Sequence, residues 1–301
     1  MRYILGIDIG ASKISLGLVS NGGKVFEQKK FLTEMHRGKI AVLQNISSAI
    51  GSYPRSAYRR IGIGIIGAVD WRKGISITAD KFPRNWRNVP VGRHLRSQFR
   101  VPVHLDNDAN AFAVGAAVEK APHAKGVFGL TVGSGIGGGF VMNGRIWHGR
   151  DNWASEIGHT TIDENSTIRC SCGQVGHSDV LAGGWGIERQ YAKRTGRTAS
   201  ARQIEIALQK GDRAARTLFQ SMANALGVTL ANIVAMYNPE VICIGGGLSR
   251  FKGYIPSAVN QMKKRLHTLP PRLPKILLIR NPEAANIRGA AFLTFSKYHS
   301  I

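Results

Sequence analysis

A strand, a glycine loop and a hairpin occur twice in this chain, and this repeat limits the fold more than any other feature. In the first copy, residues 3–31, the runs YILGIDI, ISLGLVS and KVFEQKKF are typical of strands, with an Asn-Gly-Gly turn before the third. In the second copy, residues 127–147, VFGLTVG and GGGFVMN precede an Asn-Gly turn and RIW. Placing Asp8 on Thr131 aligns a glycine two residues later and brings the two turns within one residue of each other. The repeat predicts two similar domains.

The segments between and after the copies predict an α/β fold. We expect strands at 61–67, 101–105 and 240–246, and helices near 109–120, 185–195, 201–210, 212–237 and 286–298. Strands followed by alternating helices and strands, repeated, are typical of two α/β domains around a cleft. We expect an N-terminal domain over 1–120 and a C-terminal domain over 121–285. The C-terminal helix within 286–301 is expected to join the first domain.

Cysteine content favours a reducing compartment. The 301 residues include 3 cysteines, too few for a disulfide framework, so a cytoplasmic protein is expected. No leader is visible, because Asp8 and Lys13 interrupt the apolar start, and no membrane span is expected there.

Net charge is the unusual feature of the composition. The chain has 41 Lys and Arg against 18 Asp and Glu, which gives a formal net charge of +23. One interpretation is a surface for nucleic acid or polyphosphate, and the other is an ordinary solvated basic exterior. No aromatic-rich nucleic-acid motif lies among the arginines, so nucleic acid is not the expected partner.

The stretch 158–179, GHTTIDENSTIRCSCGQVGHSD, places two cysteines between two histidines. His159, Cys170, Cys172 and His177 form a nitrogen and sulfur donor set that suits a closed tetrahedral Zn²⁺ site. The alternative is a metal-free loop with two reduced thiols.

Six short motifs in order resemble the ROK family of sugar kinases and repressors. They are Asp-x-Gly-x-Ser-Lys, Asn-Asp-Ala-Asn, a glycine-rich hairpin, Glu-x-Gly-His, Cys-x-Cys-Gly and Gly-Gly-Gly, and they span almost the whole chain. The resemblance implies the actin-like ATPase fold of two ribonuclease-H-like domains, and it implies a homodimer. It also implies an ATP- and Mg²⁺-dependent hexose kinase.

Three glycine-containing loops are expected to bind the nucleotide. In 8-DIGASK-13, a carboxylate at a strand end can hold Mg²⁺, and the glycine lets backbone N–H groups approach phosphate. An ordinary hairpin with an accidental aspartate is the alternative for this loop. The loop 131-TVGSGIGGG-139 has five glycines in nine residues, which an ordinary strand would not contain. The third loop, 244-IGGGLS-249, follows a strand and is expected to open a helix. The expected nucleotide-binding residues are Asp8, Gly10, Ser12, Lys13, Thr131, Gly133, Ser134, Gly135, Gly245, Gly246 and Gly247.

The motif 106-DNDAN-110 is expected to supply the catalytic base. The resemblance makes Asp108 the general base, because a sugar hydroxyl is a poor nucleophile until its proton is accepted. Asn107 is expected to hold neighbouring hydroxyls, while Asp106 is interpreted as no more than a helix cap.

The resemblance also assigns sugar contacts to Gly67, Glu156, His159 and Asp179. If zinc takes one ring nitrogen of His159, the other nitrogen can donate to a sugar hydroxyl. This chain departs from the family pattern at His177, where a third cysteine is usual, and at Asp179, where a glutamate is usual. It departs again at Pro83, where an asparagine that contacts the sugar is common.

The predicted function is transfer of the γ-phosphoryl group of ATP to a hexose hydroxyl, expected to be O6, with glucose as the first choice of sugar. N-acetylglucosamine, N-acetylmannosamine and fructose are the alternatives within the family. A sugar-sensing repressor is disfavoured, because the first strand begins at Tyr3 and leaves no room for a helix-turn-helix domain. A polyphosphate-using kinase is favoured only by the charge.

Overall fold

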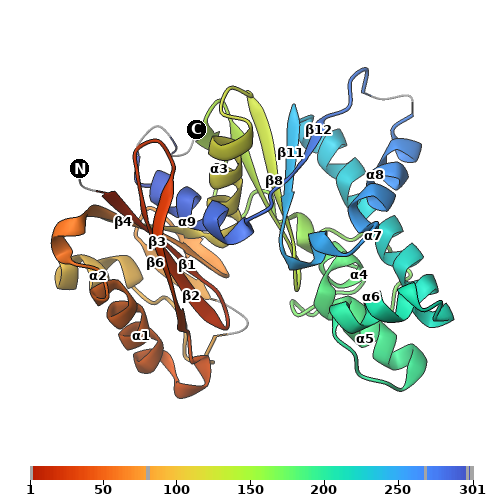
Figure 1. Ribbon diagram of the computed structural model, residues 1–301, viewed down its shortest axis with the longest axis horizontal. Coiled ribbons are helices and arrows are strands. Elements are labelled where there is room, and N and C mark those ends of the chain that lie inside the picture. Colours follow the sequence, from red (N-terminus) through yellow and green to blue (C-terminus); the bar gives the residue numbers. More distant parts are fainter. Residues whose placement is uncertain (1–2, 79–81, 268–269, 296–297, 299–301) are drawn as a thin grey trace. The chain divides into compact units, whose positions relative to one another are not determined.

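The computed structural model describes residues 3–78, 82–267, 270–295 and 298 (Figure 1). The chain divides into two compact units. Unit 1 comprises Met1–Gly129, Gly139–Ser155 and Ile279–Ile301, and unit 2 comprises Leu130–Gly138 and Glu156–Leu278. The segment that follows the last strand therefore belongs with the N-terminal part of the chain.

The first sheet has five strands in the order β3 (Val25–Leu32), β2 (Lys13–Val19), β1 (Tyr3–Ile9), β4 (Tyr58–Ile65) and β7 (Val103–Asn107). The strands β1 and β2 pair antiparallel, as do β2 and β3, whereas β4 pairs parallel with both β1 and β7. Parallel strands have their carboxyl ends at the same edge of a sheet. Asp8 of β1 and Asn107 of β7 therefore lie near the same edge, with β4 between their strands.

The second sheet repeats this strand order. It runs β10 (Arg145–Ile146), β9 (Ile136–Met142), β8 (Gly126–Val132), β11 (Val241–Gly245) and β12 (Lys275–Leu278). If the strands of each sheet are numbered along the chain, both sheets have the order 3-2-1-4-5. The strand β11 pairs parallel with β12. The shared order confirms the repeat that the sequence predicts. A small hairpin of β5 (Ala68–Asp70) and β6 (Ile75–Thr78) completes the strands among the described residues.

The two faces of β1 meet different helices (Figure 1). Leu5 and Ile7 point into a buried core that includes Val42 and Ile46 of helix α1 (Lys39–Gly51). The opposite face carries Gly6, where a Cβ would overlap the backbone of α9 (Pro282–Phe292) at Ile287. Because side chains alternate along a strand, Asp8 lies on the α9 face with Gly6.

The remaining helices of unit 1 are α2 (Val91–Phe99) and α3 (Asp108–Lys120), with short 3₁₀ turns at Met35–Arg37 and Arg55–Ala57. In unit 2 they are α4 (Ser178–Ala182), α5 (Gly184–Thr195), α6 (Ala201–Gln209), α7 (Arg213–Tyr237) and α8 (Tyr254–Arg265). The predicted helices at 109–120, 185–195, 201–210 and 212–237 are confirmed. Among the described residues, α7 is the one helix long and apolar enough to cross a bilayer, but 61% of its most apolar window is buried in the protein. That burial is typical of a core helix.

Two elements differ from the prediction. The last helix begins at Pro282, before the predicted start, because the side chain of Asn281 caps the N–H of Ala284 and proline occupies the first turn. It ends at Phe292, earlier than predicted. Residues 296–297 of the predicted helix lie outside the described part of the chain. The loop after β11 opens only a 3₁₀ turn, Gly247–Arg250, and α8 follows from Tyr254.

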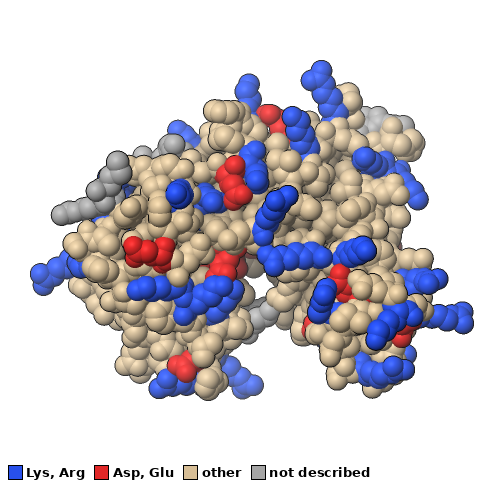
Figure 2. Space-filling model, viewed as in Figure 1, with Lys and Arg blue, Asp and Glu red and all other residues tan. Residues whose placement is uncertain are grey.

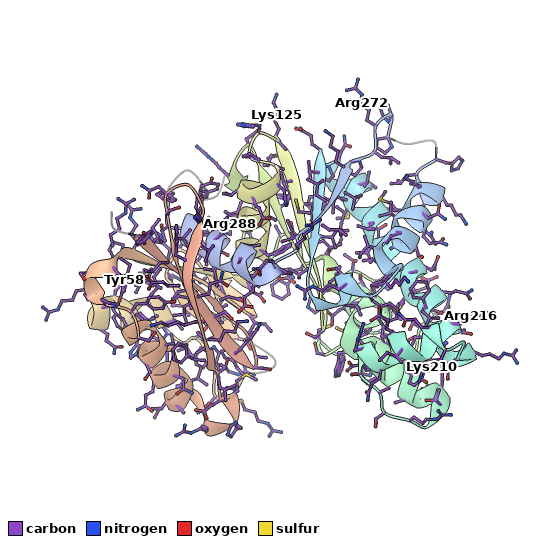
Figure 3. All side chains as sticks on the ribbon, in the orientation of Figure 1. Tyr58, Lys125, Lys210, Arg216, Arg272 and Arg288 are labelled. Atoms are coloured by element: carbon purple, nitrogen blue, oxygen red, sulfur yellow. The ribbon has the colours of Figure 1, made fainter. Side chains whose placement is uncertain are left out.

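Basic side chains are spread over the visible surface, with few acidic ones among them (Figure 2). Lys210, Arg216 and Arg272 are exposed on unit 2, and Figure 3 shows them on its outside. Arg288 of α9 is different, because it is partly buried and forms an ion pair with Glu119 at 2.6 Å.

Candidate active site

Asp8 is the residue before the last of β1, the central strand of the first sheet, and a tight turn follows. The N–H of Gly10 donates to the carbonyl of Lys13 at 3.0 Å, and the hydroxyl of Thr33 donates to the carbonyl of Gly10 at 2.8 Å. Burial and, to a smaller extent, the charge of Asp108 raise the pKa of Asp8, a hydrogen bond from Asn286 partly opposes both effects, and together these contacts place the pKa at about 7. The negative charge of Asp8 is therefore poorly compensated, which is the setting that a bound cation stabilises.

Lys13 and Ser12 of the same turn have partners within unit 1. The ammonium group of Lys13 lies 3.6 Å from the carboxylate of Glu283, which Lys30 also contacts at 2.8 Å. The carbonyl of Ser12 accepts from the N–H of Thr33 at 3.1 Å, and the residue is exposed. An anion that approached Lys13 would compete with Glu283.

Asn107 is the N-cap of α3. Its Oδ1 accepts from the N–H groups of Ala109 at 2.8 Å and Asn110 at 3.3 Å, and its Nδ2 donates to the carbonyl of Gly67 at 3.0 Å. Among the described residues, the other N–H of the Asn107 amide has no acceptor. Asp108 is the first residue of α3, is only partly buried, and accepts from the N–H of Ala109 at 3.0 Å. Gly67, Asn107 and Asp108 thus lie close together at the end of the first sheet.

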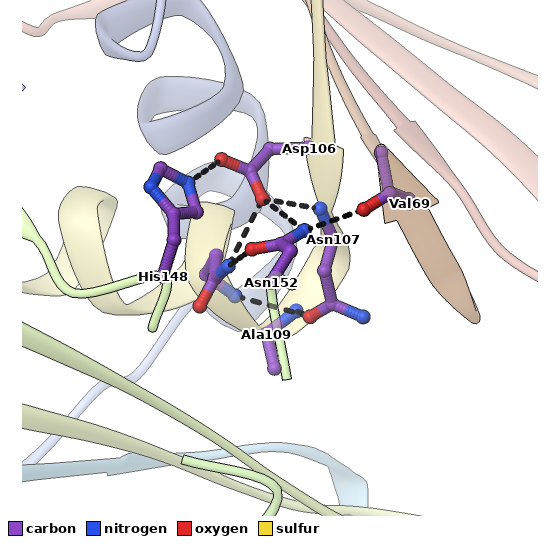
Figure 4. A network of polar contacts seen from close by, with 7 residues as sticks. Val69, Asp106, Asn107, Ala109, His148 and Asn152 are labelled. Atoms are coloured by element: carbon purple, nitrogen blue, oxygen red, sulfur yellow. Dashed lines mark hydrogen bonds and ion pairs between the residues drawn. The ribbon is translucent and has the colours of Figure 1, made fainter. Parts of the chain in front are cut away.

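Asp106 is not a helix cap, contrary to the prediction, because Asn107 has that role. Asp106 is 2% exposed and lies at the centre of a polar network (Figure 4). Its Oδ1 accepts from Asn107 N at 2.7 Å and Asn110 Nδ2 at 2.9 Å, and its Oδ2 contacts His148 Nε2 at 2.7 Å. His148 was missed because 42 residues separate it from Asp106 and no local motif links them.

The glycine loop 133–135 of unit 2 is held by backbone contacts. Gly133 N donates to Gly135 O at 2.9 Å, while Gly184 N donates to Gly133 O at 2.9 Å and Trp185 N to Ser134 O at 2.8 Å. Backbone hydrogen bonds therefore connect this loop to the start of α5. No sequence pattern predicted this contact.

Gly246 has a φ of 101°, and a Cβ there would overlap the backbone of Val132. Glycine is needed at this position for both reasons. Thr131 lies on the strand before the first loop, and its hydroxyl donates to Gly137 O at 3.3 Å. Gly245 is the last residue of β11.

Both glycine loops border one pocket of about 550 Å³ within unit 2. Its lining comes from the loop 133–135, from α5 and α6, and from the glycine loop and turn after β11. The lining residues are Gly133, Ser134, Gly184, Trp185, Glu188, Ala201, Arg202, Glu205, Gly247, Leu248, Arg250 and Phe251. Sequence reasoning found three of these residues, Gly133, Ser134 and Gly247. Six of the others lie on α5 and α6, whose local sequence carries no binding motif, and Leu248, Arg250 and Phe251 belong to the turn after β11.

Trp185 and Glu205 give this pocket an aromatic and a charged wall. The Trp185 side chain is 40% exposed, and the guanidinium of Arg189 lies 4.5 Å from its ring centroid. Burial raises the pKa of Glu205, but hydrogen bonds from Lys252 N and Arg202 outweigh burial and hold it below its usual range. A pocket of this size with a few polar groups suits a small ligand.

The four predicted zinc ligands lie together in unit 2. The donor atoms of His159, Cys170, Cys172 and His177 are all within 4.8 Å of one another. The Sγ of Cys170 lies 3.8 Å from Nδ1 of His159, and the Sγ of Cys172 lies 3.4 Å from Nδ1 of His177. Zinc held about 2.3 Å from sulfur and about 2.0 Å from nitrogen at tetrahedral angles separates those atoms by about 3.5 Å. The donor set therefore fits Zn²⁺ in both chemistry and spacing.

The protonation states around this cluster are also compatible with a metal. Burial lowers the pKa of His177, with a further effect from His159, so its ring is neutral at pH 7. Burial raises the pKa of the Cys170 thiol, so without a cation this sulfur keeps its proton. A cation would be needed to stabilise the thiolate.

Asp179 links the cluster to the first glycine loop of unit 2. Its Oδ1 accepts from Ile136 N at 2.7 Å, a Cβ on Gly135 would overlap that oxygen, and Oδ2 lies 3.9 Å from Cys170 Sγ. One carboxylate oxygen is therefore committed to the backbone. Glu156 and His159 lie one 3₁₀ turn apart, with His159 N donating to Glu156 O at 3.0 Å. The residues predicted to hold the sugar are thus divided between the units, with Gly67, Asn107 and Asp108 in unit 1 and the other three in unit 2.

Comparison with known proteins gives matches over nearly the whole chain. The glucokinase of Thermotoga maritima is 32% identical over 265 residues, which cover 82% of each chain. The N-acetyl-D-glucosamine kinase of Escherichia coli O6:H1 is 32% identical over 309 residues, which cover 96% of this chain and 98% of that one.

Among solved structures, a ROK family glucokinase from Streptomyces griseus, in complex with glucose and AMPPNP, superposes with a TM-score of 0.82. It is 25% identical, and the match covers 97% of this chain and 98% of that one. The ROK family profile matches residues 4–297. The chain therefore belongs to the ROK family and has its actin-like ATPase fold.

Proposed function

We propose that this protein is an ATP-dependent sugar kinase that transfers the γ-phosphoryl group to a hexose hydroxyl, O6 in the first instance, with glucose as the first substrate. The observation that carries the proposal is the full-length likeness to kinases of glucose and N-acetylglucosamine. The retention of Asp108 at the start of α3 supports it. A repressor is not favoured, since these relatives are kinases.

Asp108 is the proposed general base. The hydroxyl that attacks the γ-phosphorus must lose its proton, and a carboxylate within hydrogen-bond reach accepts it. Asn107 is held on both sides by the cap of α3 and the carbonyl of Gly67, so its remaining N–H is fixed in direction. Such a donor orients a neighbouring sugar hydroxyl at little entropic cost.

We propose that the pocket beside Gly133, Ser134 and Gly247 takes the nucleoside end of ATP. Backbone N–H groups of glycine loops approach phosphates closely, because no side chain intervenes. Asp8 would hold Mg²⁺, directly or through water, and the raised pKa of its carboxyl is the supporting observation. Magnesium supplies charge neutralisation of the transferred phosphoryl group when bound.

We propose a structural Zn²⁺ on His159, Cys170, Cys172 and His177. The Nδ1 atom of His159 faces the sulfur of Cys170. If Nδ1 ligates zinc, Nε2 carries the ring proton, and we propose that it donates to a sugar hydroxyl. Asp179 is proposed as a further sugar contact through its Oδ2, since Oδ1 is bonded to Ile136.

The sugar is identified by a panel in a coupled ADP-release assay. Glucose, N-acetylglucosamine, N-acetylmannosamine and fructose are each offered with ATP, and with polyphosphate as the other donor. Glucose with ATP is expected to give the highest kcat/KM. A higher value for another sugar would move the proposal to that sugar, and turnover with none of them would remove it. A homodimer and a cytoplasmic location are proposed with the function, and light scattering after gel filtration tests the dimer.

A further inference from the structure

Asp106 and His148 form a buried pair that the proposed mechanism does not use. Asp106 is 2% exposed and His148 is 1% exposed, and their side chains meet at 2.7 Å (Figure 4). The His148 ring stacks on Trp71 with centroids 4.5 Å apart and an interplanar angle of 15°. A carboxylate oxygen only accepts, so His148 donates to Asp106 through Nε2–H, and Nδ1 has no hydrogen-bond partner among the described residues.

The pair joins three segments that are distant in sequence. Asn152 Nδ2 donates to Val69 O at 3.1 Å and lies 3.4 Å from Asp106 Oδ1, while its own Oδ1 accepts from Asn110 Nδ2 at 3.1 Å. The joined segments are 67–69, 106–110 and 148–152. These segments contain Gly67, Asn107 and Asp108, and the third ends four residues before Glu156.

We propose that Asp106 and His148, with Asn110 and Asn152, position two groups: the Asn107 amide that holds the sugar and the Asp108 carboxylate that serves as the general base. Asp106 acts on them directly, because its Oδ1 accepts from the backbone N–H of Asn107 and from the side chain of Asn110 in the first turn of α3. His148 acts through Asp106, because its donated hydrogen bond fixes the rotation of the carboxylate. This inference rests on the proposed kinase function.

Loss of the His148 donor would leave a buried carboxylate oxygen unpaired. The carboxylate would rotate or admit water, and both of its contacts to 107–110 would shift. A misplacement of about 1 Å at a reacting group lowers turnover by about 100-fold. We therefore expect kcat/KM for the sugar to fall, while KM for ATP changes little.

The test uses His148→Phe, which keeps a ring against Trp71 and removes the donor, and His148→Gln, which supplies an amide donor again. For His148→Phe we expect kcat/KM for the sugar to fall by about 10- to 100-fold, with KM for ATP within about twofold. His148→Gln should recover most of the loss. Tyr53→Phe is the matched control, because it removes a buried hydrogen bond to Leu16 O and a partly buried one to Glu27 O elsewhere in unit 1.

A double-mutant cycle separates positioning from general destabilisation. If His148 acts in part through the Asn107 side chain, then His148→Phe should lower kcat/KM for the sugar by a smaller factor in an Asn107→Ala background than in the wild type, with the remaining effect passing through Asp108. Should His148→Phe fail to fold, Asn152→Gly replaces it. This variant removes the side chain at a φ of 60°, which glycine adopts readily.

Three results would decide the matter. An undiminished His148→Phe effect in the Asn107→Ala background would overturn the inference, as would equal losses for sugar and ATP that Tyr53→Phe reproduces. A sugar-specific loss that His148→Gln restores would support it. A wild-type protein that phosphorylates no sugar would instead reject the proposed function, which is a separate outcome.

Discussion

Asp108 is the residue on which the chemistry depends. We expect Asp108→Asn to lower kcat by about 10²–10⁴-fold, because the amide cannot accept the hydroxyl proton, while the dissociation constant for the sugar changes little. Single-turnover kinetics and calorimetric sugar titration measure the two quantities. Wild-type turnover in Asp108→Asn would remove the assignment.

Asp8 is predicted to make stability depend on pH. Its pKa is raised to about 7 in the folded protein from an ordinary value of 3.8, so only well below pH 4 are the folded and unfolded chains both largely protonated at this residue. As pH rises, the unfolded chain loses the proton first, and folded stability falls until about pH 7. Above that pH the full cost of the buried charge is present.

Asp8→Asn should therefore be more stable than wild type at pH 8 without Mg²⁺, by about 1–3 kcal/mol, with the difference shrinking toward pH 4. Urea unfolding of both proteins at pH 4, 6 and 8 measures it. Asp151→Asn is the control, since the side chain of Asp151 is 66% exposed. A stability difference that does not vary with pH would contradict the assignment.

The loop 159–179 carries the element-scale prediction. We expect about one zinc per chain, lost on chelation or in Cys172→Ala, and retained in Cys243→Ala, which removes a buried cysteine of β11 outside the cluster. Two thiolates compensate the ion less than three would, so His177→Cys should hold zinc more tightly. Metal content by mass spectrometry measures all four proteins.

Zinc removal should weaken sugar binding more than nucleotide binding, because His159 belongs to the metal cluster and the pocket beside Gly133 does not. Sugar and ATP affinities before and after chelation, and after zinc is restored, test this. Protein that never contains zinc yet phosphorylates sugar normally would refute the proposal.

Elements with local signals were predictable from the sequence. Alternating apolar residues and Asn-Gly turns located both hairpins, and apolar periodicity located α3, α5, α6 and α7. The helix α1 was missed, because it begins after Gly38 with no side-chain cap and no acidic residue in its first turn. The helix α8 likewise begins after Gly253 without a cap.

The site was predictable only where a motif is contiguous. The glycine loops and DNDAN are short runs, and the four metal ligands fall within 19 residues. Contacts made by folding, such as Asp106 with His148 or Trp185 beside Ser134, join segments that no local pattern relates.

At the scale of the whole molecule, the net charge of +23 is proposed to be a solvated surface. Nucleic acid should then bind weakly, without sequence preference, and the affinity should fall steeply with salt. Fluorescence anisotropy with unrelated DNA duplexes between about 0.05 and 0.2 M salt measures this. Tight binding to one sequence at about 0.15 M salt would favour the repressor interpretation again.

Phosphoryl transfer itself is tested most directly by following the γ-phosphate. The protein is incubated with glucose and ATP labelled at the γ-phosphoryl oxygens, and mass spectrometry locates the label. The proposed function predicts labelled glucose 6-phosphate and ADP in equal amounts, with little ADP in the absence of sugar. Label found only in inorganic phosphate, or no ADP with any hexose of the panel, would contradict it.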